Sequence, residues 1–361
     1  MKREIVHYNI DRLANIGADF NILFGERSNG KSYQLKHKMG VENYLKTGKR
    51  FILMRRFREE VTTEKIEQYF QDVDVFKLTN GKYNCISVYR KAIYLANFDN
   101  EKCKVVRGEK IGYAVALSTE QNYAGGSFLD VSDIIFEEFM TRSRYLGESE
   151  PTKLMNFYAT VDRKRGTTKL WLVGNSISRV CPYIYEWGLH EIISKQKQGT
   201  IEVKEIKATD DDVVKLAIEY CASTGVSSHT IGFNKDMMND GSWQSSPQPH
   251  LPKSLKYYDK KFTIGFFYQG FKFLGNLLQD KETKEMAWNI IPYEKEFNNK
   301  TIVFSDIIKT SIYYQRNIYD VTIKNDNLKK LLQTFREDKI FYATDLCGTD
   351  FKQVIDFSIR R

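Results

Sequence analysis

Apolar and polar residues alternate in blocks along the first 190 residues of the chain. Short apolar runs lie at Phe20–Phe24, Phe51–Met54, Ile134–Phe136 and Leu170–Val173, and polar stretches that are compatible with helices separate them. Runs of this kind are typical of strands. Strands that alternate with helices predict a mostly parallel α/β sheet in this part of the chain.

The pattern changes after residue 205. Residues 211–220, DDVVKLAIEY, have helical periodicity, and the stretch that follows is rich in Gly and Ser and contains three of the six prolines. We therefore interpret 206–252 as a linker region that contains a helix. The predicted domains on either side of it are 1–205 and 253–361.

The second predicted domain begins with a clear strand signal. In KKFTIGFFYQGFKFLGNLLQD, β-branched and aromatic residues lie on both sides of Gln269-Gly270, a pair that is compatible with a turn. This arrangement predicts a β-hairpin over 262–275. The rest of the domain fits a smaller α+β fold.

Length and composition narrow the class of protein. The chain has 361 residues, 42% of them hydrophobic and 28% charged, which suits a soluble protein with two domains. No apolar run approaches the roughly 20 residues that span a bilayer, and no secretion signal is evident. The five cysteines are widely spaced, which predicts neither disulfides nor a zinc cluster. The formal charge of +9 favours a polyanionic partner, although a basic chain can also serve only solubility.

One short stretch has the spacing G-x-x-x-x-G-K-S, formed by Gly25, Gly30, Lys31 and Ser32. A strand-compatible run precedes it and a helix-compatible stretch follows, which is the context of a phosphate-binding loop. There, backbone N–H groups surround phosphate oxygens, the lysine reaches the β- and γ-phosphates, and the serine hydroxyl binds Mg²⁺. A glycine turn before a helix is the alternative. Glu26 does not exclude the site, because we expect its side chain to face solvent or a neighbouring molecule.

Two adjacent acids follow another apolar run. Residues 134–136 lead into Glu137 and Glu138 at the expected carboxyl end of a strand, where ligands of open α/β sheets bind. We expect Glu137 to help hold Mg²⁺ and Glu138 to orient and deprotonate the attacking water. A solvated helix start is the alternative for the pair alone. Together with the loop, the pair indicates a P-loop ATPase with an additional catalytic glutamate.

Further candidates lie around the strand KLWLVGN. It ends at Asn175, whose amide is suited to sensing the γ-phosphate or holding the attacking water, unless it is an ordinary loop residue. Before this strand, the sequence predicts a helix with a cationic end formed by Arg163, Lys164 and Arg165. That end is compatible with solvation, with a DNA contact, or with an arginine finger that reaches a neighbouring subunit's nucleotide.

In this order, the motifs resemble those of the DNA encapsidation ATPases of phi29-like tailed phages, over most of the chain. No single motif is specific, but the series is. The residues that carry the resemblance are YN at 8–9, FGERSNGKSY at 24–33, FILMRRF at 51–57, ALS at 116–118 with Gln121, IIFEEF at 134–139, TVDRKR at 160–165, GN at 174–175 with VCPY at 180–183, and FTIGFFYQGFKFLG at 262–275.

The resemblance implies an ATP-driven, Mg²⁺-dependent motor that moves double-stranded DNA through the portal into a preformed capsid. It implies a homo-oligomeric ring, expected to be pentameric, that contacts the portal and procapsid; participation of a packaging RNA stays open. The expected location is the cytoplasm of the infected bacterium, transiently at the portal vertex and not in the mature virion. The second domain would resemble an RNase H-type nuclease that has lost its chemistry. Because residues 262–275 contain no acid, we predict no nuclease activity.

The resemblance also implies roles for single residues. Lys31, Ser32, Glu138 and Asn175 match the family pattern, and Arg163 matches its trans-acting arginine, with Arg27 as a rival. Arg55, Arg56, Lys164 and Arg165 are candidates for contacts with DNA or other subunits, and the first two also for anchoring the sheet edge. The implied ATP-binding residues are Tyr8, Gly25, Glu26, Arg27, Ser28, Asn29, Gly30, Lys31, Ser32 and Tyr33, and the implied metal-binding residues are Ser32 and Glu137.

Two residues depart from the family pattern. Glu137 stands where aspartate is typical, and its extra methylene would move the metal further from the strand. Ser28 replaces a glycine, which predicts a stiffer loop.

Two other functions stay open on the sequence alone. A phage or plasmid replication helicase, or a helicase loader, would have a similar ATPase core, although no helicase-specific motif is evident. A nucleotide-regulated binding or scaffold protein would need no hydrolysis, and the adjacent acids weigh against it.

Overall fold

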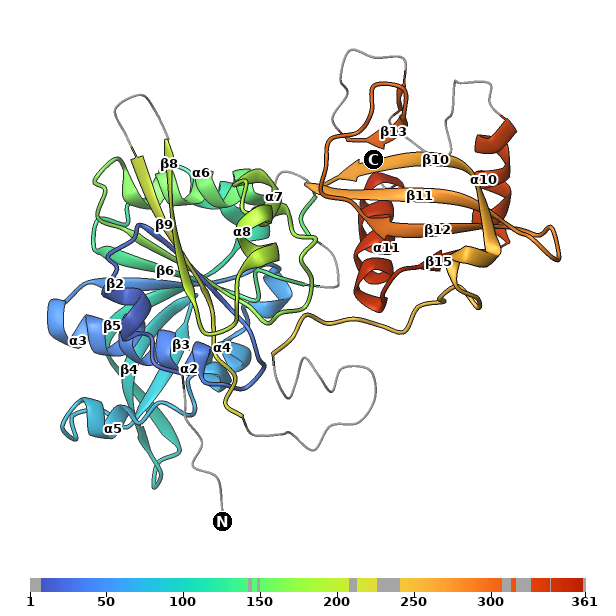
Figure 1. The fold of residues 1–361 in the computed structure, drawn as a ribbon. Coiled ribbons are helices and arrows are strands. Elements are labelled where there is room, and N and C mark those ends of the chain that lie inside the picture. The colour runs from blue at the N-terminus through green and yellow to red at the C-terminus, as the bar shows by residue number, and fades with distance from the viewer. Residues whose placement is uncertain are drawn as a thin grey trace. The chain divides into compact units, whose positions relative to one another are not determined.

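The computed structural model describes residues 8–141, 145–147, 150–207, 213–225, 241–306, 313–315, 326–337 and 339–359 (Figure 1). The chain forms two compact units. The first runs to Ile177 and resumes at Lys195, and the second comprises residues 178–194 and the chain from Trp243 onward. None of the described helices has the length and apolar character needed to cross a membrane.

A nine-stranded mixed sheet forms the centre of the first unit, in the order β3-β4-β5-β2-β6-β7-β1-β9-β8. The neighbouring strands from β5 through β2, β6, β7 and β1 to β9 are all parallel. The strands at the two edges, β3 and β4 on one side and β8 on the other, are antiparallel to their neighbours. The four apolar runs of the sequence are β1, β2, β6 and β7, so the predicted α/β sheet is confirmed. The strands are β1 (Phe20–Phe24), β2 (Arg50–Arg55), β3 (Cys85–Tyr89), β4 (Ala92–Asp99), β5 (Lys104–Ala116), β6 (Val131–Glu137), β7 (Lys169–Val173), β8 (Ile201–Lys207) and β9 (Val213–Tyr220).

The helix predicted in residues 211–220 is wrong. Val213–Tyr220 form β9, which pairs in parallel with β1 and antiparallel with β8. Leu216 to Tyr220 are all buried because β9 lies inside the sheet. A strand that is buried on both faces has a continuous apolar run, which periodicity cannot distinguish from a buried helix. The first unit therefore extends past residue 205 into the region interpreted as a linker.

A helical segment follows the phosphate-loop motif from Lys31 to Thr47. It consists of α2 (Lys31–Gln34), a π-helix (Leu35–Glu42) and α3 (Asn43–Thr47). Eight π-helical residues are unusual, since this form mostly occurs as single turns, often at functional sites. The other helical elements of this unit are α1 (Asp11–Ala14), α4 (Thr63–Tyr69), α5 (Val75–Leu78), α6 (Glu150–Asp162) and short 3₁₀ segments at Arg58–Glu60 and Leu117–Tyr123.

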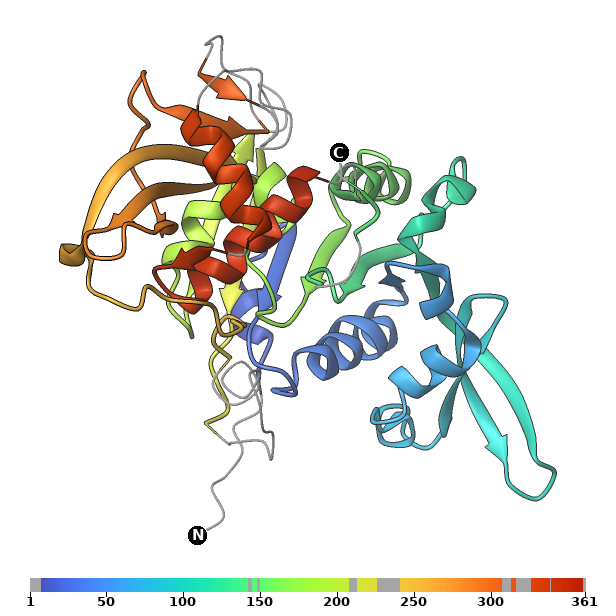
Figure 2. The same ribbon diagram turned by 90° about the vertical axis from the view of Figure 1, so that its right-hand side faces the viewer.

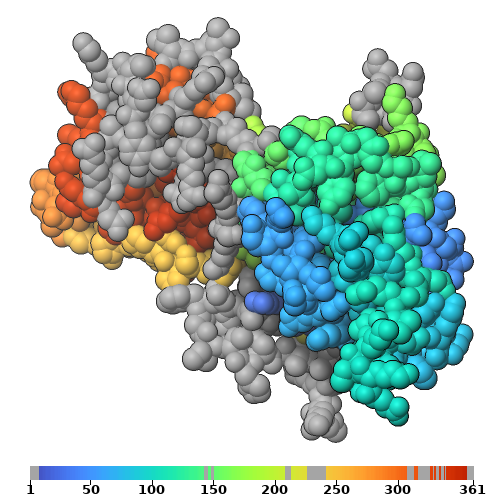
Figure 3. Space-filling model, turned by 180° about the vertical axis from the view of Figure 1, so that it is seen from behind, coloured from blue at the N-terminus to red at the C-terminus, as the bar shows by residue number. Residues whose placement is uncertain are grey.

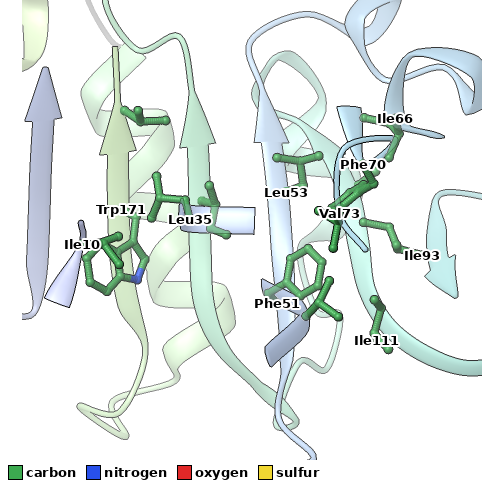
Figure 4. Close-up of a cluster of buried hydrophobic side chains, with 14 of the residues drawn as sticks. Ile10, Leu35, Phe51, Leu53, Ile66, Phe70, Val73, Ile93, Ile111 and Trp171 are labelled. Atoms are coloured by element: carbon green, nitrogen blue, oxygen red, sulfur yellow. The ribbon is translucent and has the colours of Figure 1, made fainter. Parts of the chain in front are cut away.

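Figure 4 shows part of the core of the first unit, where the π-helix packs on the sheet. Leu35 from the π-helix, Phe51 from β2 and Trp171 from β7 are among its buried side chains. Trp171 also donates its Nε1–H to Asp133 Oδ1 on β6 at 2.8 Å, and burial raises the pKa of this aspartate. Packing and a buried hydrogen bond therefore fix β6, the strand that ends at Glu137 and is followed by Glu138.

The second unit is built on a six-stranded sheet in the order β14-β13-β10-β11-β12-β15. The predicted hairpin is confirmed: β10 and β11 are antiparallel, and Gln269 and Gly270 form the turn with φ of +50° and +79°. Helix α11 packs on β10, β12 and β15, with Phe351 in edge contact with Phe266 and Phe273. The elements are α7 (Pro182–Glu186), α8 (His190–Lys195), a 3₁₀ turn (Leu255–Tyr257), β10 (Tyr258–Tyr268), β11 (Phe271–Asp280), β12 (Met286–Pro292), β13 (Ile302–Ser305), β14 (Tyr314–Gln315), α10 (Asp326–Arg336), β15 (Ile340–Tyr342) and α11 (Asp345–Ile359).

The position of β9 can be tested by side-chain truncation. Ile218 in β9 is fully buried, whereas Val203 in β8 is 47% exposed. Ile218→Ala should lower the free energy of unfolding by about 2–5 kcal/mol, because it leaves a cavity in the core. Val203→Ala, the control, should change it by less than about 0.5 kcal/mol. Urea denaturation measures both, and equally small effects would contradict a strand inside the sheet.

Candidate nucleotide-binding site

The phosphate-loop motif connects the end of β1 to the start of α2, at the carboxyl edge of the parallel strands (Figure 1). Gly25 and Gly30 have φ of +148° and +98°, which residues with side chains rarely adopt. A Cβ added at Gly25 would also lie 3.1 Å from the carbonyl oxygen of Cys221. Ser28 has a left-handed φ of +63°, so the serine occupies a position that favours glycine.

Lys31 lies inside the loop and is almost completely buried. Its Nζ donates to the backbone carbonyl oxygen of Glu26 and to Asn29 Oδ1, the latter at 3.1 Å. Burial lowers the pKa of Lys31, because the ammonium loses hydration. The two oxygens that solvate the ammonium are those that phosphate oxygens would replace.

Ser32 and Glu137 lie in direct contact at the other side of the loop. The hydroxyl of Ser32 donates to Glu137 Oε2 at 3.0 Å, and the hydroxyl of Tyr69, from α4, donates to Oε1 at 2.6 Å. Burial raises the pKa of Glu137. A hydroxyl and one carboxylate suit Mg²⁺, which prefers oxygen ligands and keeps waters and substrate phosphates as its other ligands. The longer side chain of Glu137 therefore still reaches the serine.

Glu138 differs from its neighbour in environment and backbone. It has a left-handed φ of +57°, and its side chain is 58% exposed. Arg55, at the end of β2, pairs with Glu138 at 2.9 Å and with Glu60 at 3.2 Å. The turn after β6 thus buries one acid beside Ser32 and directs the other toward Arg55.

A cavity of about 370 Å³ brings most of the predicted residues together. Residues 27–33 of the loop and helix start, both acids, and the end of β7 with Asn175 line it. Lys36 and Asp72, which form an ion pair, lie at the same cavity. Arg27 is exposed and lines the cavity of its own chain.

The expectation that Glu26 faces solvent or a neighbour is wrong. Its side chain is buried, and its carboxylate accepts hydrogen bonds from the backbone N–H and the hydroxyl of Thr224, at 2.8 and 3.0 Å. Thr224 follows β9, far from the loop in sequence. A carboxylate is stable inside the fold here because two donors replace its hydration.

Tyr8 is placed beside the loop rather than in the cavity. Its backbone N–H donates to the carbonyl oxygen of Asn29 at 2.9 Å, and its hydroxyl donates to Glu219 Oε2 on β9 at 2.7 Å. Burial and the neighbouring carboxylate raise the pKa of Tyr8 well above its usual range. Tyr8 therefore ties the loop to β9, and its side chain does not line the nucleotide cavity.

The three cations after α6 have different surroundings. Arg163 and Lys164 are exposed and have left-handed φ of +50° and +61°. Arg163 donates to the carbonyl oxygen of Gly126 at 2.6 Å and does not line the cavity of its own chain. Arg165 instead donates to several backbone carbonyl oxygens within the chain, including those of Leu129 at 2.8 Å and Val161 at 2.9 Å. Its guanidinium anchors the end of α6, and a contact of Arg165 with DNA or another subunit stays a prediction.

Arg56 is also held by partners within its own chain. Its Nε lies 3.0 Å from both carboxylate oxygens of Glu150, which is fully buried, and its other nitrogens donate to the carbonyl oxygens of Glu138 and Phe139. Of the three roles left open, only the anchor fits a buried side chain. Arg56 holds the turn that carries Glu138.

Two functional contacts were missed by the sequence analysis, those of Tyr69 and Thr224. Both residues are more than 35 positions from the groups they contact, and no spacing rule connects them. The only available signal was Thr62 before TEKIEQY, an N-cap that marks the helix on which Tyr69 lies.

The fold and the site define a P-loop nucleotide-binding protein: a strand, a glycine loop, a helix, and an acid that reaches the helix's first serine. The family model of the podovirus DNA encapsidation protein (Gp16) matches residues 1–212. Because this match spans more than half of the chain, the chain belongs to that family, and the resemblance seen in the motifs is confirmed.

Similar proteins cover most of the chain. The DNA packaging protein of Bacillus phage B103 is 28% identical over 341 residues, 91% of this chain and 94% of that protein. The DNA packaging protein of Bacillus phage phi29 is 25% identical over 273 residues, 73% of each. A chain of the solved bacteriophage Phi-29 viral genome packaging motor assembly covers 98% of this chain and 99% of its own length, with a TM-score of 0.57 and 19% identity. That likeness shows a shared fold.

The contact between Tyr69 and Glu137 can be tested with Tyr69→Phe, which removes the hydroxyl and keeps the ring. The variant should fold normally but require about tenfold more Mg²⁺ for nucleotide-dependent activity, because hydrogen bonds to a metal-binding carboxylate typically contribute 10–100-fold in affinity. A Mg²⁺ titration of ATPase activity measures this. Tyr44→Phe is the matched control, since the hydroxyl of Tyr44 contacts Glu109 away from the cavity. An unchanged Mg²⁺ requirement in Tyr69→Phe would contradict the assignment.

Proposed function

We propose that this chain is the ATPase subunit of a phage motor that moves double-stranded DNA through the portal into a preformed capsid. The observation that carries the proposal is the contact between Ser32 and Glu137, beside Lys31 and Glu138 in one cavity. These are the groups that a P-loop ATPase needs. Membership in the DNA encapsidation family supports packaging as the use of the ATPase.

Each residue has a definite role in this proposal. Lys31 exchanges its contacts with the loop for the β- and γ-phosphates of ATP. Ser32 and Glu137 hold Mg²⁺, which neutralises phosphate charge when bound. Glu138 takes a proton from the attacking water, and Asn175, at the end of β7, orients that water.

The Arg55 ion pair constrains Glu138 as a base. The guanidinium of Arg55 lies 2.9 Å from a carboxylate oxygen of Glu138. It competes with water for the same oxygens. We propose that hydrolysis proceeds when Glu138 faces the water rather than Arg55.

We propose that the subunits form a pentameric ring in which Arg163 acts on the neighbour's nucleotide. The exposure of Arg163 and its position outside its own cavity support this role. Arg27, which lines the cavity of its own chain, would act in cis. The ring would bind the portal and procapsid, with a packaging RNA as a further partner, in the cytoplasm of the infected host. It would leave before the virion is mature.

We also propose that the second unit is an RNase H-like module without nuclease activity. Two-metal nucleases need carboxylates that converge on the metals. Asp280 at the end of β11 is instead used by the chain, since it accepts from the backbone N–H of Glu282 at 2.8 Å and of Thr283 at 3.1 Å and pairs with Lys253. Incubation of the purified chain with plasmid DNA and Mg²⁺ or Mn²⁺ tests this directly, and cleavage would contradict it.

The packaging function predicts a specific loss in Glu138→Gln. With empty capsids, portal and ATP, the natural chain should make duplex DNA resistant to added nuclease. Glu138→Gln should bind ATP but lose most turnover and all DNA protection, because the water is no longer activated. The control is Glu60→Gln, which changes the other carboxylate on Arg55 outside the nucleotide cavity. ATP-dependent strand separation without DNA protection would indicate a helicase instead.

Subunit mixing tests the role of Arg163. Arg163→Ala should lower ATPase activity by about 10³-fold, as expected for loss of an arginine finger. Mixing it with Lys31→Ala subunits should restore part of the activity. In a mixed assembly, the Arg163→Ala subunit has an intact Lys31, and a neighbouring Lys31→Ala subunit supplies an intact Arg163. Lys164→Ala, which removes the adjacent exposed cation, should have little effect. Intact assemblies that show no rescue at any ratio would exclude action in trans.

A further inference from the structure

The turn between β3 and β4 has an unusual sequence for its conformation. Tyr89 pairs with Ala92, so Arg90 and Lys91 form a two-residue turn, and both have left-handed φ, +47° and +63°. Two-residue hairpin turns with this backbone favour Asn-Gly, because bulky side chains are strained there. The chain thus keeps two cations at a position where they have a conformational cost, and strain of this kind often marks a functional site.

A third cation gathers at the same place. The guanidinium of Arg107, on β5, lies 4.8 Å from the ring centre of Tyr89, and that of Arg90 lies 5.2 Å from it. Tyr89 is 47% exposed, so the assembly is on the surface. The ring holds two like charges close together, an arrangement that an anion would stabilise. We call Tyr89, Arg90, Lys91 and Arg107 the basic turn.

Neighbouring cations differ from the basic turn in having acidic partners. Lys82 pairs with Glu109, and Lys102 pairs with Asp99 at 3.7 Å. Within the described parts of the chain, Arg90, Lys91 and Arg107 form no ion pair. The surplus of positive charge is therefore local to the basic turn.

The basic turn is joined through β5 to β2, the strand that ends at Arg55, the ion-pair partner of Glu138. Ala114 on β5 donates its N–H to the carbonyl oxygen of Lys91 at 2.8 Å and pairs with Leu53 on β2, two residues before Arg55. Figures 2 and 3 show the hairpin of β4 and β5, coloured cyan to teal, at the surface of the first unit; its tip after Asp99 is the opposite end of β4 from the basic turn. Tyr89, Arg90 and Arg107 are exposed, and the bond from Ala114 places the turn at the same edge of the sheet as the carboxyl end of β2.

We propose that the basic turn binds the phosphate backbone of double-stranded DNA. The inference rests on the packaging function proposed above, which supplies the polyanion. Guanidinium groups match phosphate oxygens in two-pronged hydrogen bonds, and backbone contacts of this kind need no base sequence. Because both guanidinium groups lie against one exposed ring, they can contact the same phosphate backbone.

The test uses the full chain and a blunt duplex DNA, with binding followed by fluorescence anisotropy between 50 and 200 mM salt. The variant combines Arg90→Asn, Lys91→Gly and Arg107→Gln. It should bind about tenfold more weakly, and the slope of log affinity against log salt should fall by about 2–3, roughly one for each lost phosphate contact. Its melting temperature should be equal or higher, because Asn-Gly relieves the turn. ATPase activity without DNA should not change.

The matched control combines Lys82→Gln and Lys102→Gln, which removes nearby cations that have acidic partners, and should leave the slope almost unchanged. An equal loss in this control, or an unchanged slope in the basic-turn variant, would overturn the proposal. If the basic-turn variant lost binding to duplex RNA but kept its binding to duplex DNA, the basic turn would be assigned to RNA. If instead its oligomeric state changed, the basic turn would be assigned to a contact with a second copy of the chain. If the natural chain bound no duplex DNA at all, the packaging function would fail as well.

Discussion

The hydrogen bond between Ser32 and Glu137 connects the two parts of the site that must act together. Ser32 begins the helix after the phosphate loop, and Glu137 ends β6, which lies two strands away from β1 in the sheet. The parallel register of β1, β7 and β6 brings both residues to one edge. Burial makes the carboxylate costly, so the hydroxyls of Ser32 and Tyr69 are needed to stabilise it. The contact joins the phosphate loop to the end of β6 at the wall of the cavity, and Glu138 follows directly.

The phosphate loop is also bonded to the chain that follows β9. Glu26 accepts two hydrogen bonds from Thr224, and the hydroxyl of Ser176, just after β7, donates to the carbonyl oxygen of Gly241 at 2.7 Å. Gly241 and Ser242 directly precede Trp243, where the second unit resumes. Glu26 thus contacts Lys31 through its backbone carbonyl oxygen and Thr224 through its carboxylate. Hydrogen bonds therefore connect the ends of β1 and β7 to the residues that follow β9 and to those that precede Trp243.

The arginines of this protein fall into two groups, those bonded within the chain and those exposed without a carboxylate partner, and composition alone does not distinguish them. Arg56 and Arg165 are held within the chain by a carboxylate and by carbonyl oxygens, so they serve the fold. Arg163, Arg90 and Arg107 are exposed and have no carboxylate partner among the described residues, so they are available to other molecules. Neighbours in sequence can differ completely in this respect. Arg163 and Arg165, two positions apart, are the clearest case, because the left-handed backbone at Arg163 and Lys164 turns the chain between them.

The sequence alone determined the local features: the strands that are apolar throughout, the loop that needs glycine at 25 and 30, and the hairpin turn at Gln269-Gly270. These depend on backbone conformation and on residues near each other in the chain. It did not distinguish β9 from a helix, because a strand covered on both faces loses the alternation that marks strands. Only the tertiary structure decided that Tyr69 contacts Glu137, that Thr224 binds Glu26 and that Arg56 is buried. Each of these contacts joins segments distant in sequence, and its energy comes from replacing the hydration of a buried charge, which no local pattern records.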